Sequence, residues 1–540
     1  MITNPILPGF NPDPSICRVG EDYYIATSTF EWYPGVQIHH SRDLVNWTLI
    51  KRPLDRASQL DMRGNPDSCG IWAPCLSHAD GLFWLVYTDV KRYSGFKDTH
   101  NYIVTSPSIE GPWSDPVHVN SSGFDPSLFH DTDGRKYFMN MYFNHRTEAP
   151  GGHQATPSFL GILLQEWDAA SGQLLGKPQN VFRGSYLGLV EGPHVFQRNG
   201  WYYMTLAEGG TGYNHAVTMA RSRNIWGPYE MHPQVHVLTT KDAPQAPLQR
   251  AGHGQYVETP DGLAYHTHLC SRPLPGTRLS PLGRESALQK CVWRDDDWLY
   301  LESTDRGPLV PAVQVPAPNP LSVAAPAKPC LSTFTNRELP IEFQWLRTPY
   351  PERLFSLTGK ALRLHARESI GSWFEQALVA RRQEHFVFRA ETQVEFDPET
   401  HQQVAGLTLY YNQFKYHALG VTWHEVLGRC LTVISCEANY PDAKPNFPLP
   451  ALIQLPVEGP IGLACQVDHA QLRWQYRVAN DWINVGPVLD ASLISDEAGR
   501  GVHGSFTGAF VGMVAFDLSG GAKPADFDYF NYTPLDASEG

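Results

Sequence analysis

The stretch that decides the fold is Phe124-Asp-Pro-Ser-Leu-Phe-His-Asp-Thr-Asp-Gly-Arg-Lys-Tyr137, where Asp125 lies eight positions before a polar turn that opens an aromatic strand. The same arrangement occurs five times in the first half of the chain. The offset is nine residues in the first copy and eight in the other four. The leading residues are Asp13, Trp72, Asp125, Glu191 and His253. This regularity predicts one strand-turn-strand unit used five times.

The length of the repeat indicates how the units are arranged. Consecutive copies lie roughly 55 to 65 residues apart, which is too long for a helical solenoid and suits the four-stranded blade of a propeller. The innermost strand of each blade lines the propeller axis, so the five leading residues should meet around one pocket. We therefore predict an all-β fold that begins with a five-bladed β-propeller.

Composition narrows the classes of partner. Of 540 residues, 18% are charged, and 45 glycines and 44 prolines favour turn-rich β structure over helical bundles. The formal net charge of -13, without a basic stripe, argues against nucleic acid or an anionic membrane as partner. An uncharged small molecule, such as a neutral oligosaccharide, is the simpler expectation.

The cysteines and the N-terminal segment indicate the cellular compartment. The nine cysteines are scattered and form no CxxC pair, so they predict neither a disulfide framework nor a zinc site. The first residues, Met-Ile-Thr-Asn-Pro-Ile-Leu-Pro-Gly-Phe10, lack the features of a signal peptide, and no later stretch reaches the ~20 apolar residues of a membrane span. We expect a cytoplasmic protein.

A proline-rich segment marks the predicted domain boundary. Residues 308–329 carry seven prolines among valine and alanine, which favours an extended, semi-rigid linker. We assign residues 1–307 to the propeller and residues 330–540 to a second domain. Short apolar strands without helical periodicity, such as Leu407-Thr-Leu-Tyr-Tyr411, recur after the linker and predict a β-sandwich.

Three of the five leading residues are acids: Asp13, Asp125 and Glu191. Each stands next to proline or glycine and could serve only to build a turn. Turn building does not require a shared offset, however, so the shared offset favours function. Two carboxyls on either side of a sugar are the usual equipment for cleaving a glycosidic bond, and a third can raise the pKa of the acid by charge repulsion. The pattern alone does not assign their roles.

Other residues are candidates for the pocket wall. Phe30, Trp32, Trp72 and Phe124 could offer flat faces to a sugar, although propeller aromatics more often pack between blades. Trp72 is favoured because it is itself a leading residue. A lone histidine such as His253 more often has a structural role than a metal-binding one. Arg284 lies in the segment that should close the propeller, where it could line the pocket or pair with its neighbour Glu285.

These segments together resemble glycoside hydrolase family 43, in particular its two-domain β-xylosidases, over nearly the whole chain. The resemblance implies a five-bladed propeller followed by a β-sandwich, in agreement with the repeat. The motifs that carry it are Asn4-Pro-Ile-Leu-Pro-Gly-Phe-Asn-Pro-Asp-Pro-Ser15, Ser28-Thr-Phe-Glu-Trp-Tyr-Pro-Gly35, Gly70-Ile-Trp-Ala-Pro74, Gly188-Leu-Val-Glu-Gly-Pro-His194, Ala207-Glu-Gly-Gly-Thr-Gly-Tyr213, Leu282-Gly-Arg-Glu-Ser-Ala-Leu288 and Phe506-Thr-Gly-Ala-Phe-Val-Gly512.

The resemblance also implies individual roles. Asp13 matches the general base, Glu191 the general acid, and Asp125 the carboxylate that tunes and orients the acid. Arg284 matches a substrate-binding arginine, and Phe506 a residue by which the second domain narrows the pocket mouth, which implies exo action. Further pocket residues by this resemblance are Phe30, Trp72, Phe124, Thr211 and His253. No cofactor is implied as required and no metal ligand is assigned, although His253 matches a position that connects to calcium in some relatives.

The resulting expectation is an inverting, exo-acting β-1,4-xylosidase that acts on xylo-oligosaccharides. Inversion implies a separation of roughly 6.5 to 9.5 Å between the carboxyls of Asp13 and Glu191. The alternatives are α-L-arabinofuranosidase activity, alone or as a second activity, a retaining fructan hydrolase, and a sugar-binding protein without catalysis. The resemblance also implies a homodimer or homotetramer.

Overall fold

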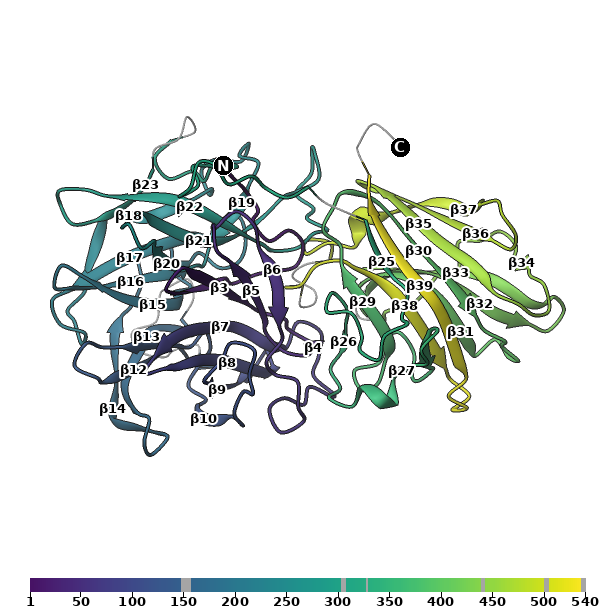
Figure 1. Cartoon of the computed structure of the whole chain (residues 1–540), viewed down its shortest axis with the longest axis horizontal. Coiled ribbons are helices and arrows are strands. Elements are labelled where there is room, and N and C mark those ends of the chain that lie inside the picture. Colours follow the sequence, from purple (N-terminus) through teal and green to yellow (C-terminus); the bar gives the residue numbers. More distant parts are fainter. Residues whose placement is uncertain (147–156, 303–306, 327–328, 439–441, 500–504, 536–540) are drawn as a thin grey trace.

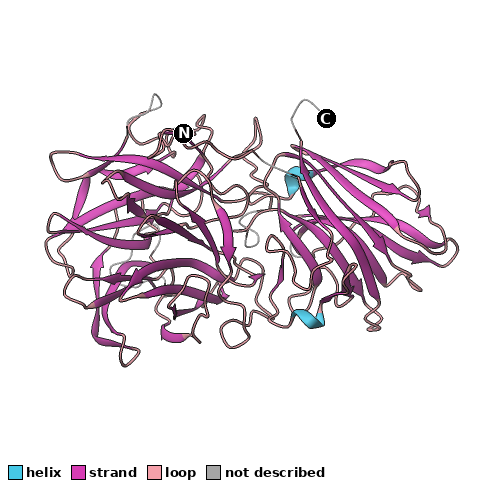
Figure 2. Ribbon diagram, in the orientation of Figure 1, coloured by secondary structure: helices cyan, strands magenta, loops and turns pink. Residues whose placement is uncertain are grey.

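The computed structural model describes residues 1–146, 157–302, 307–326, 329–438, 442–499 and 505–535, and this part of the chain is built almost entirely of strands (Figure 2). The helices in it are two short 3-10 turns, η1 (Pro351–Arg353) and η2 (Ala491–Leu493). Within these ranges no helix is long and apolar enough to cross a bilayer. Figure 1 shows two bodies side by side, the N-terminal one in purple to teal and the C-terminal one in green to yellow.

The first body is a five-bladed propeller, which confirms the prediction from the repeat. Each blade is an antiparallel sheet. The first strands of the first four blades contact one another in succession, and β20 of the fifth blade contacts β2 of the first. The blades are β2 (Ser15–Val19), β3 (Asp22–Thr27), β5 (Gln37–Ser41) and β6 (Thr48–Lys51); β7 (Gly70–Ala79), β8 (Leu82–Arg92), β9 (Asp98–Ser106) and β10 (Val117–Asn120); β11 (Ser127–His130), β12 (Lys136–Phe143), β13 (Phe159–Asp168) and β14 (Gln173–Phe182); β15 (Glu191–Arg198), β16 (Trp201–Glu208), β17 (Ala216–Ser222) and β18 (Glu230–Thr239); and β19 (Gln249–Gly252), β20 (Tyr256–Glu258), β21 (Ala264–Ser271), β22 (Glu285–Trp293) and β23 (Leu299–Leu301).

Aromatic side chains pack adjacent blades together. The rings of Tyr24 and Phe83 join the first two blades at 5.5 Å between centroids, and those of Phe196 and Tyr256 join the last two at 4.3 Å. Such contacts bury large apolar areas between sheets that have little core of their own. Packing between blades is therefore the role of many aromatic residues in the repeat.

The N-terminal segment closes the ring against the fifth blade. Backbone hydrogen bonds link Leu7 to Ser286 of β22 in both directions, at 3.1 and 3.3 Å. The Asn4 side chain exchanges hydrogen bonds with the backbone of Leu288, both at 2.8 Å. The short strand β1 (Ile2–Thr3) pairs with β24 (Gln314–Val315), so the proline-rich segment 308–329 is itself partly held in a sheet.

The second body is a β-sandwich of two eight-stranded sheets, as predicted. One sheet contains β25 (Cys330–Ser332), β27 (Phe355–Leu357), β28 (Leu362–His365), β30 (Val387–Glu395), β35 (Ile461–Asp468), β36 (Gln471–Arg477), β37 (Ile483–Asp490) and β39 (Pro524–Pro534). The other contains β4 (Trp32–Tyr33), β26 (Gln344–Leu346), β29 (Ala377–Arg382), β31 (Gln403–Asn412), β32 (Lys415–His424), β33 (Gly428–Glu437), β34 (Ile453–Gln454) and β38 (Phe510–Asp517).

Strand β4 crosses the sequence boundary between the two bodies. It belongs to the propeller part of the chain, yet it forms the edge of a sandwich sheet by pairing with β26. Its Trp32 is fully buried and stacks on Phe510 of β38, with centroids 3.6 Å apart. Trp32 therefore lies in the domain interface, and the expectation that it could face the pocket is wrong.

Candidate active site

The leading residues of the repeat occupy unusual backbone positions at the inner edges of the blades. Asp13, Asp125 and His253 have φ angles of 57°, 53° and 37°, in the left-handed region that non-glycine residues seldom adopt. The carbonyls that precede the two aspartates accept equivalent hydrogen bonds, from Ser28 N to Pro12 O and from Met141 N to Phe124 O. The same backbone geometry in the first and third blades thus turns the two aspartates toward the axis, and such strain is typical of functional sites.

These side chains meet in a cavity of about 530 Å³ at one end of the propeller axis, against the sandwich. All ten residues to which the family resemblance gives a site role line it, whereas Trp32 does not. The acids among them are Asp13, Asp125 and Glu191, and their relative exposures of 5%, 7% and 8% show that water has little access to them. Residues distant in sequence are therefore brought together as the repeat requires.

Asp13 is held by hydrogen bonds to both carboxyl oxygens. The Ser28 hydroxyl donates to Oδ2 at 2.6 Å, and Arg284 Nη1 donates to Oδ1 at 3.0 Å. This arrangement orients the carboxylate before any substrate enters. The alternative pairing of Arg284 with Glu285 does not occur, because Glu285 instead binds Arg272 at 2.7 Å.

Glu191 is a buried acid with a raised pKa. Burial, followed by the nearby charge of Asp13, raises the pKa of Glu191 to about 7, against the smaller opposing effects of Lys97 and Arg284. An acid with this pKa keeps a large protonated fraction near neutral pH. It can therefore donate a proton to a departing oxygen.

Burial, and then the charges of Glu191 and Asp13, raise the pKa of Asp125 well above its ordinary value. The sequence suggested that Asp125 would raise the pKa of Glu191 by charge repulsion. In the structure the repulsion between Asp125 and Glu191 raises the pKa of Asp125, and the charge of Asp13 raises that of Glu191. The three acids interact and titrate together.

His253 lies between two of the acids. Its Nδ1 is 3.7 Å from Asp13 Oδ1 and 3.9 Å from Asp125 Oδ2. Burial lowers the pKa of this imidazole, which favours the neutral ring. Gly192, with φ of 59°, lets the ring approach, since a Cβ there would come within 2.8 Å of His253 Nε2.

The surroundings of His253 offer few side-chain ligands for a calcium ion. Calcium takes six to eight oxygen ligands. In the described ranges no group of three or more His, Cys, Asp or Glu side chains could hold a metal ion. A calcium ion beside His253 would therefore need most of its oxygen ligands from water, and no step proposed below uses a metal ion.

Aromatic rings from both domains form an apolar wall. Trp72 lies 5.1 Å from Phe124 and 6.0 Å from Phe30, and Phe506 of the sandwich lies 6.4 Å from Phe30 between ring centroids. Ser68 fastens two of these rings. Its carbonyl accepts from Trp72 Nε1 at 3.0 Å, and its hydroxyl accepts from the Phe506 backbone at 3.1 Å.

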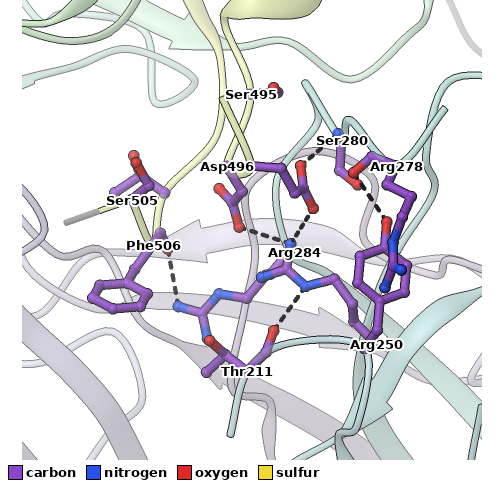
Figure 3. A network of polar contacts seen from close by, with 12 residues as sticks. Thr211, Arg250, Arg278, Ser280, Arg284, Ser495, Asp496, Ser505 and Phe506 are labelled. Atoms are coloured by element: carbon purple, nitrogen blue, oxygen red, sulfur yellow. Dashed lines mark hydrogen bonds and ion pairs between the residues drawn. The ribbon is translucent and has the colours of Figure 1, made fainter. Parts of the chain in front are cut away.

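The polar side of the pocket also joins both domains. Arg284 Nη2 donates to the Phe506 carbonyl at 2.9 Å, so the arginine that holds Asp13 also holds the sandwich (Figure 3). Thr211 lines the pocket from a glycine-rich loop, residues 209–212, between β16 and β17. The Gly-Gly-Thr-Gly sequence is thus a wall of the pocket.

Sequence reasoning missed several lining residues, Lys97, Phe159 and Leu189. Lys97 precedes β9, and its ammonium lies 4.9 to 5.1 Å from the centroids of Trp72, Phe124 and Phe143. Burial lowers the pKa of Lys97, while the charges of Glu191 and Asp125 act in the opposite direction. No motif marks Lys97 in the sequence, because it lies outside the repeated offset.

Comparison with known proteins agrees with this geometry. Residues 2–299 match the family described as glycosyl hydrolases family 43, and residues 332–533 match the beta xylosidase C-terminal concanavalin A-like domain. The chain is 57% identical to xylosidase/arabinosidase 43B of Humicola insolens, over 99% of this chain and 98% of that protein. It is 48% identical to a beta-xylosidase of Bacillus subtilis (strain 168), over 98% and 99% of the two chains.

A solved structure is similar over the same length. The xylan beta-1,4-xylosidase from Bacillus Halodurans C-125 superposes with a TM-score of 0.93 at 47% identity. The match covers 99% of this chain and all of that one. Propeller, sandwich and their arrangement are therefore shared.

Proposed function

The chain belongs to glycosyl hydrolases family 43, and from this premise we propose that it is an inverting, exo-acting β-1,4-xylosidase. Its substrates would be short xylo-oligosaccharides, from whose non-reducing ends it releases xylose. The observation that carries the proposal is one pocket with three buried carboxyls, one of them oriented by two hydrogen bonds and another with a pKa of about 7.

The proposed reaction is a single displacement at the anomeric carbon. Asp13 accepts a proton from a water molecule as the water oxygen bonds to that carbon. The glycosidic C–O bond breaks, and Glu191 gives its proton to the departing oxygen. Asp125 remains protonated and orients the acid and the sugar. Inversion requires room for the water, so the separation of roughly 6.5 to 9.5 Å between Asp13 and Glu191 stays a prediction.

Exo action is supported by the composition of the pocket wall. Phe506 comes from the sandwich and lies against Phe30 and Trp72, and its carbonyl is bound by Arg284. A second domain packed against the propeller axis narrows the space beyond one terminal sugar. A long polymer could not pass through such a site, whereas the end of a chain could enter it.

A second candidate activity is α-L-arabinofuranosidase. The observation that favours it is the 57% identical relative, whose name includes both xylosidase and arabinosidase. A terminal arabinofuranose is neutral and similar in size to xylose, so the aromatic wall and Arg284 could accept it. Both activities would use the same three acids.

The experiment is to incubate the protein with xylobiose and with arabinosyl-xylo-oligosaccharides while recording proton NMR spectra from the first turnover. The anomer is read on an aryl β-xyloside, which releases a single xylose, whereas xylobiose also releases its reducing-end xylose as an anomeric mixture. We expect this xylose as the α-anomer before mutarotation. Its initial release as the β-anomer would contradict inversion, and sugar binding without any released monosaccharide would indicate a non-catalytic protein. Faster release of arabinose than of xylose would favour the second candidate.

The same assay tests the metal requirement. After exhaustive dialysis against a chelator we expect the rate of xylose release to change less than about twofold, because the proposed steps use side chains alone. Loss of activity that added calcium restores would contradict this. We also propose a homodimer or homotetramer, from the family resemblance alone, and a cytoplasmic location, from the cysteine pattern and the N-terminal residues. Sedimentation analysis and cell fractionation would test the two.

A further inference from the structure

A buried cluster of charges lies between the domains, beside the pocket and outside it (Figure 3). Arg250 of β19 donates from Nη1 to Asp496 Oδ2 at 2.9 Å and to Glu497 Oε1 at 3.0 Å. The side chains of Arg250 and Asp496 have no exposed area. Both acids belong to the sandwich, in the segment that follows η2, whereas the arginine belongs to the propeller.

On the propeller side the cluster holds one wall of the pocket. Arg250 Nε donates to the carbonyl of Thr211 at 2.7 Å. Thr211 lies in the loop of residues 209–212, whose ends are held by backbone hydrogen bonds from Gly209 to Gly188 and from His215 to Gly212. The Arg250 guanidinium adds a side-chain bond to the middle of this wall and so connects it to the cluster.

On the sandwich side the same cluster holds the facing residue. Asp496 Oδ1 accepts a hydrogen bond from the Tyr411 hydroxyl at 2.6 Å. That hydroxyl in turn accepts from the backbone N–H of Thr507 at 2.9 Å. Because Thr507 follows Phe506, the orientation of the Phe506 ring depends on Asp496 through one tyrosine.

Lys415 braces the two sandwich segments against each other. Its fully buried ammonium donates to the Ser495 carbonyl at 2.6 Å and to the Ser505 hydroxyl at 2.7 Å. The residues on either side of Phe506 are thus both tied to the segment that carries Asp496. Arg284 completes the connection by binding the Phe506 carbonyl and Asp13.

The energetics favour a geometric role for this cluster. A buried ion pair seldom stabilises a fold more than a hydrophobic replacement would, but breaking it is costly and its geometry is narrowly defined. The hydrogen bonds here involve ionised partners, which are shorter and stronger than neutral ones. Such a cluster is suited to holding two pocket walls at a set separation.

We propose that Asp496 is a positioning residue that sets the width of the sugar pocket, by holding Thr211 through Arg250 and Phe506 through Tyr411. It would thereby govern how tightly a terminal pyranose is held and how well it is distinguished from a furanose. The inference rests on the proposed glycosidase activity and deepens it. Asp496 itself touches no substrate.

The test compares Asp496→Asn and Tyr411→Phe with the wild-type chain on an aryl β-xyloside and an aryl α-arabinofuranoside. Asparagine keeps the size of the side chain but weakens its bond to Arg250, whereas phenylalanine removes the hydroxyl that links Asp496 to Thr507 and leaves the bond between Asp496 and Arg250. We expect KM for the xyloside to rise about tenfold in D496N with kcat nearly unchanged, and less in Y411F. The xyloside-to-arabinofuranoside ratio of kcat/KM should shift at least about threefold.

A matched control separates pocket width from general loosening of the interface. Arg52 is also buried between the domains, where it donates to the carbonyls of Ile341 and Phe343, but it does not line the pocket. Arg52→Met should lower the melting temperature and leave KM within about twofold of wild type. An equal rise of KM in R52M would overturn the inference.

The double variant D496N/Y411F tests whether the two residues act in one network. If they do, its KM should be about that of D496N alone, rather than the product of the two single effects. Folded D496N or Y411F proteins with wild-type KM and substrate ratio would refute the positioning role. Should D496N fail to fold, Y411F alone decides. A wild-type chain without glycosidase activity would instead refute the proposed function.

Discussion

The propeller and the sandwich contribute to one pocket in different ways. Each propeller blade is a small radial sheet whose inner edge ends at the axis, so the turn before each first strand can present a side chain to the centre. The sandwich instead packs two eight-stranded sheets face to face, and its inward side chains are used for its own core. Among the sandwich residues that the structure describes, the one that lines the pocket is Phe506, in the segment before β38. The repeated blades of the propeller thus supply the catalytic acids, and the packing of the sandwich against the propeller shapes the pocket.

Because the two domains contribute differently, mutations in one should abolish catalysis and mutations in the other should only weaken substrate binding. Residues of the propeller axis should affect the chemical step. Residues of the sandwich should affect substrate binding and the stability of the interface. Four experiments examine this division.

The largest loss of catalytic rate is expected from replacing the acids at the propeller axis. Asp13→Ala and Glu191→Ala should each lower kcat for xylobiose by about 1,000-fold or more, because each removes a proton-transfer group. The loss for Glu191→Ala should be smaller on an aryl xyloside, whose good leaving group needs less protonation. Initial rates on both substrates provide the measurement. Unchanged circular dichroism spectra serve as the control, and normal turnover in either variant would contradict the assignment.

Phe506→Ala tests the contribution of the sandwich. Removing the ring should lower kcat/KM by roughly 10- to 100-fold through loss of apolar contact, mostly as a higher KM. The pH dependence of the rate should stay that of wild type, since no titrating group of the pocket is lost. Steady-state kinetics over a range of pH would show this. A variant that loses kcat as completely as D13A would mean that the sandwich takes part in the chemical step.

Lys97→Met tests the electrostatics of the propeller pocket. The ammonium lowers the pKa of Glu191, so its removal should raise that pKa further. The general acid works when protonated, and activity falls as pH rises through its pKa of about 7. The alkaline limb of the kcat/KM profile should therefore move to higher pH in K97M. A shift to lower pH, or none, would show that Lys97 is not coupled to the acid.

The smallest effect is expected at a buried acid of the domain interface. Arg347 of the sandwich pairs with Asp67 at 2.7 Å, beside Glu31. Burial raises the pKa of Glu31 to about 8, an effect that Arg347 opposes and Asp67 adds to. The native state then holds a proton that the unfolded chain releases near pH 4.5, so stability declines as pH rises from about 4.5 to about 8.

Glu31→Gln should remove this decline while keeping the acceptor for the Ser68 backbone N–H. The free energy of unfolding of E31Q should exceed that of wild type by about 1 kcal/mol or more at pH 8 and by little at pH 5. Its activity should be nearly unchanged. Denaturant unfolding at the two pH values is the measurement. If the free energies of unfolding of the two proteins differ by the same amount at both pH values, Glu31 does not bind a proton in the native state.

The fold and five of the ten site residues follow from the sequence because they depend on a repeated local order, and the family resemblance implied the pocket roles of the other five. The offset before each turn located Asp13, Asp125 and Glu191 without any knowledge of contacts. The same reasoning misjudged Trp32, whose strand β4 joins the sandwich rather than a blade. It passed over Lys97 and Arg250 as well, because neither stands at the repeated offset.

What the sequence determined by itself is the periodic pattern of strands and turns, and with it the axis on which the acids meet. The tertiary structure alone decided which carboxyl keeps its proton, since the pKa of Glu191 depends on burial and on the distance to Asp13, and neither is encoded in neighbouring residues. It also decided the walls of the pocket. Arg250 and Asp496 meet because the two domains pack together. A distance between charges across a domain interface produces no repeating pattern in the sequence, so it could not be predicted from the sequence.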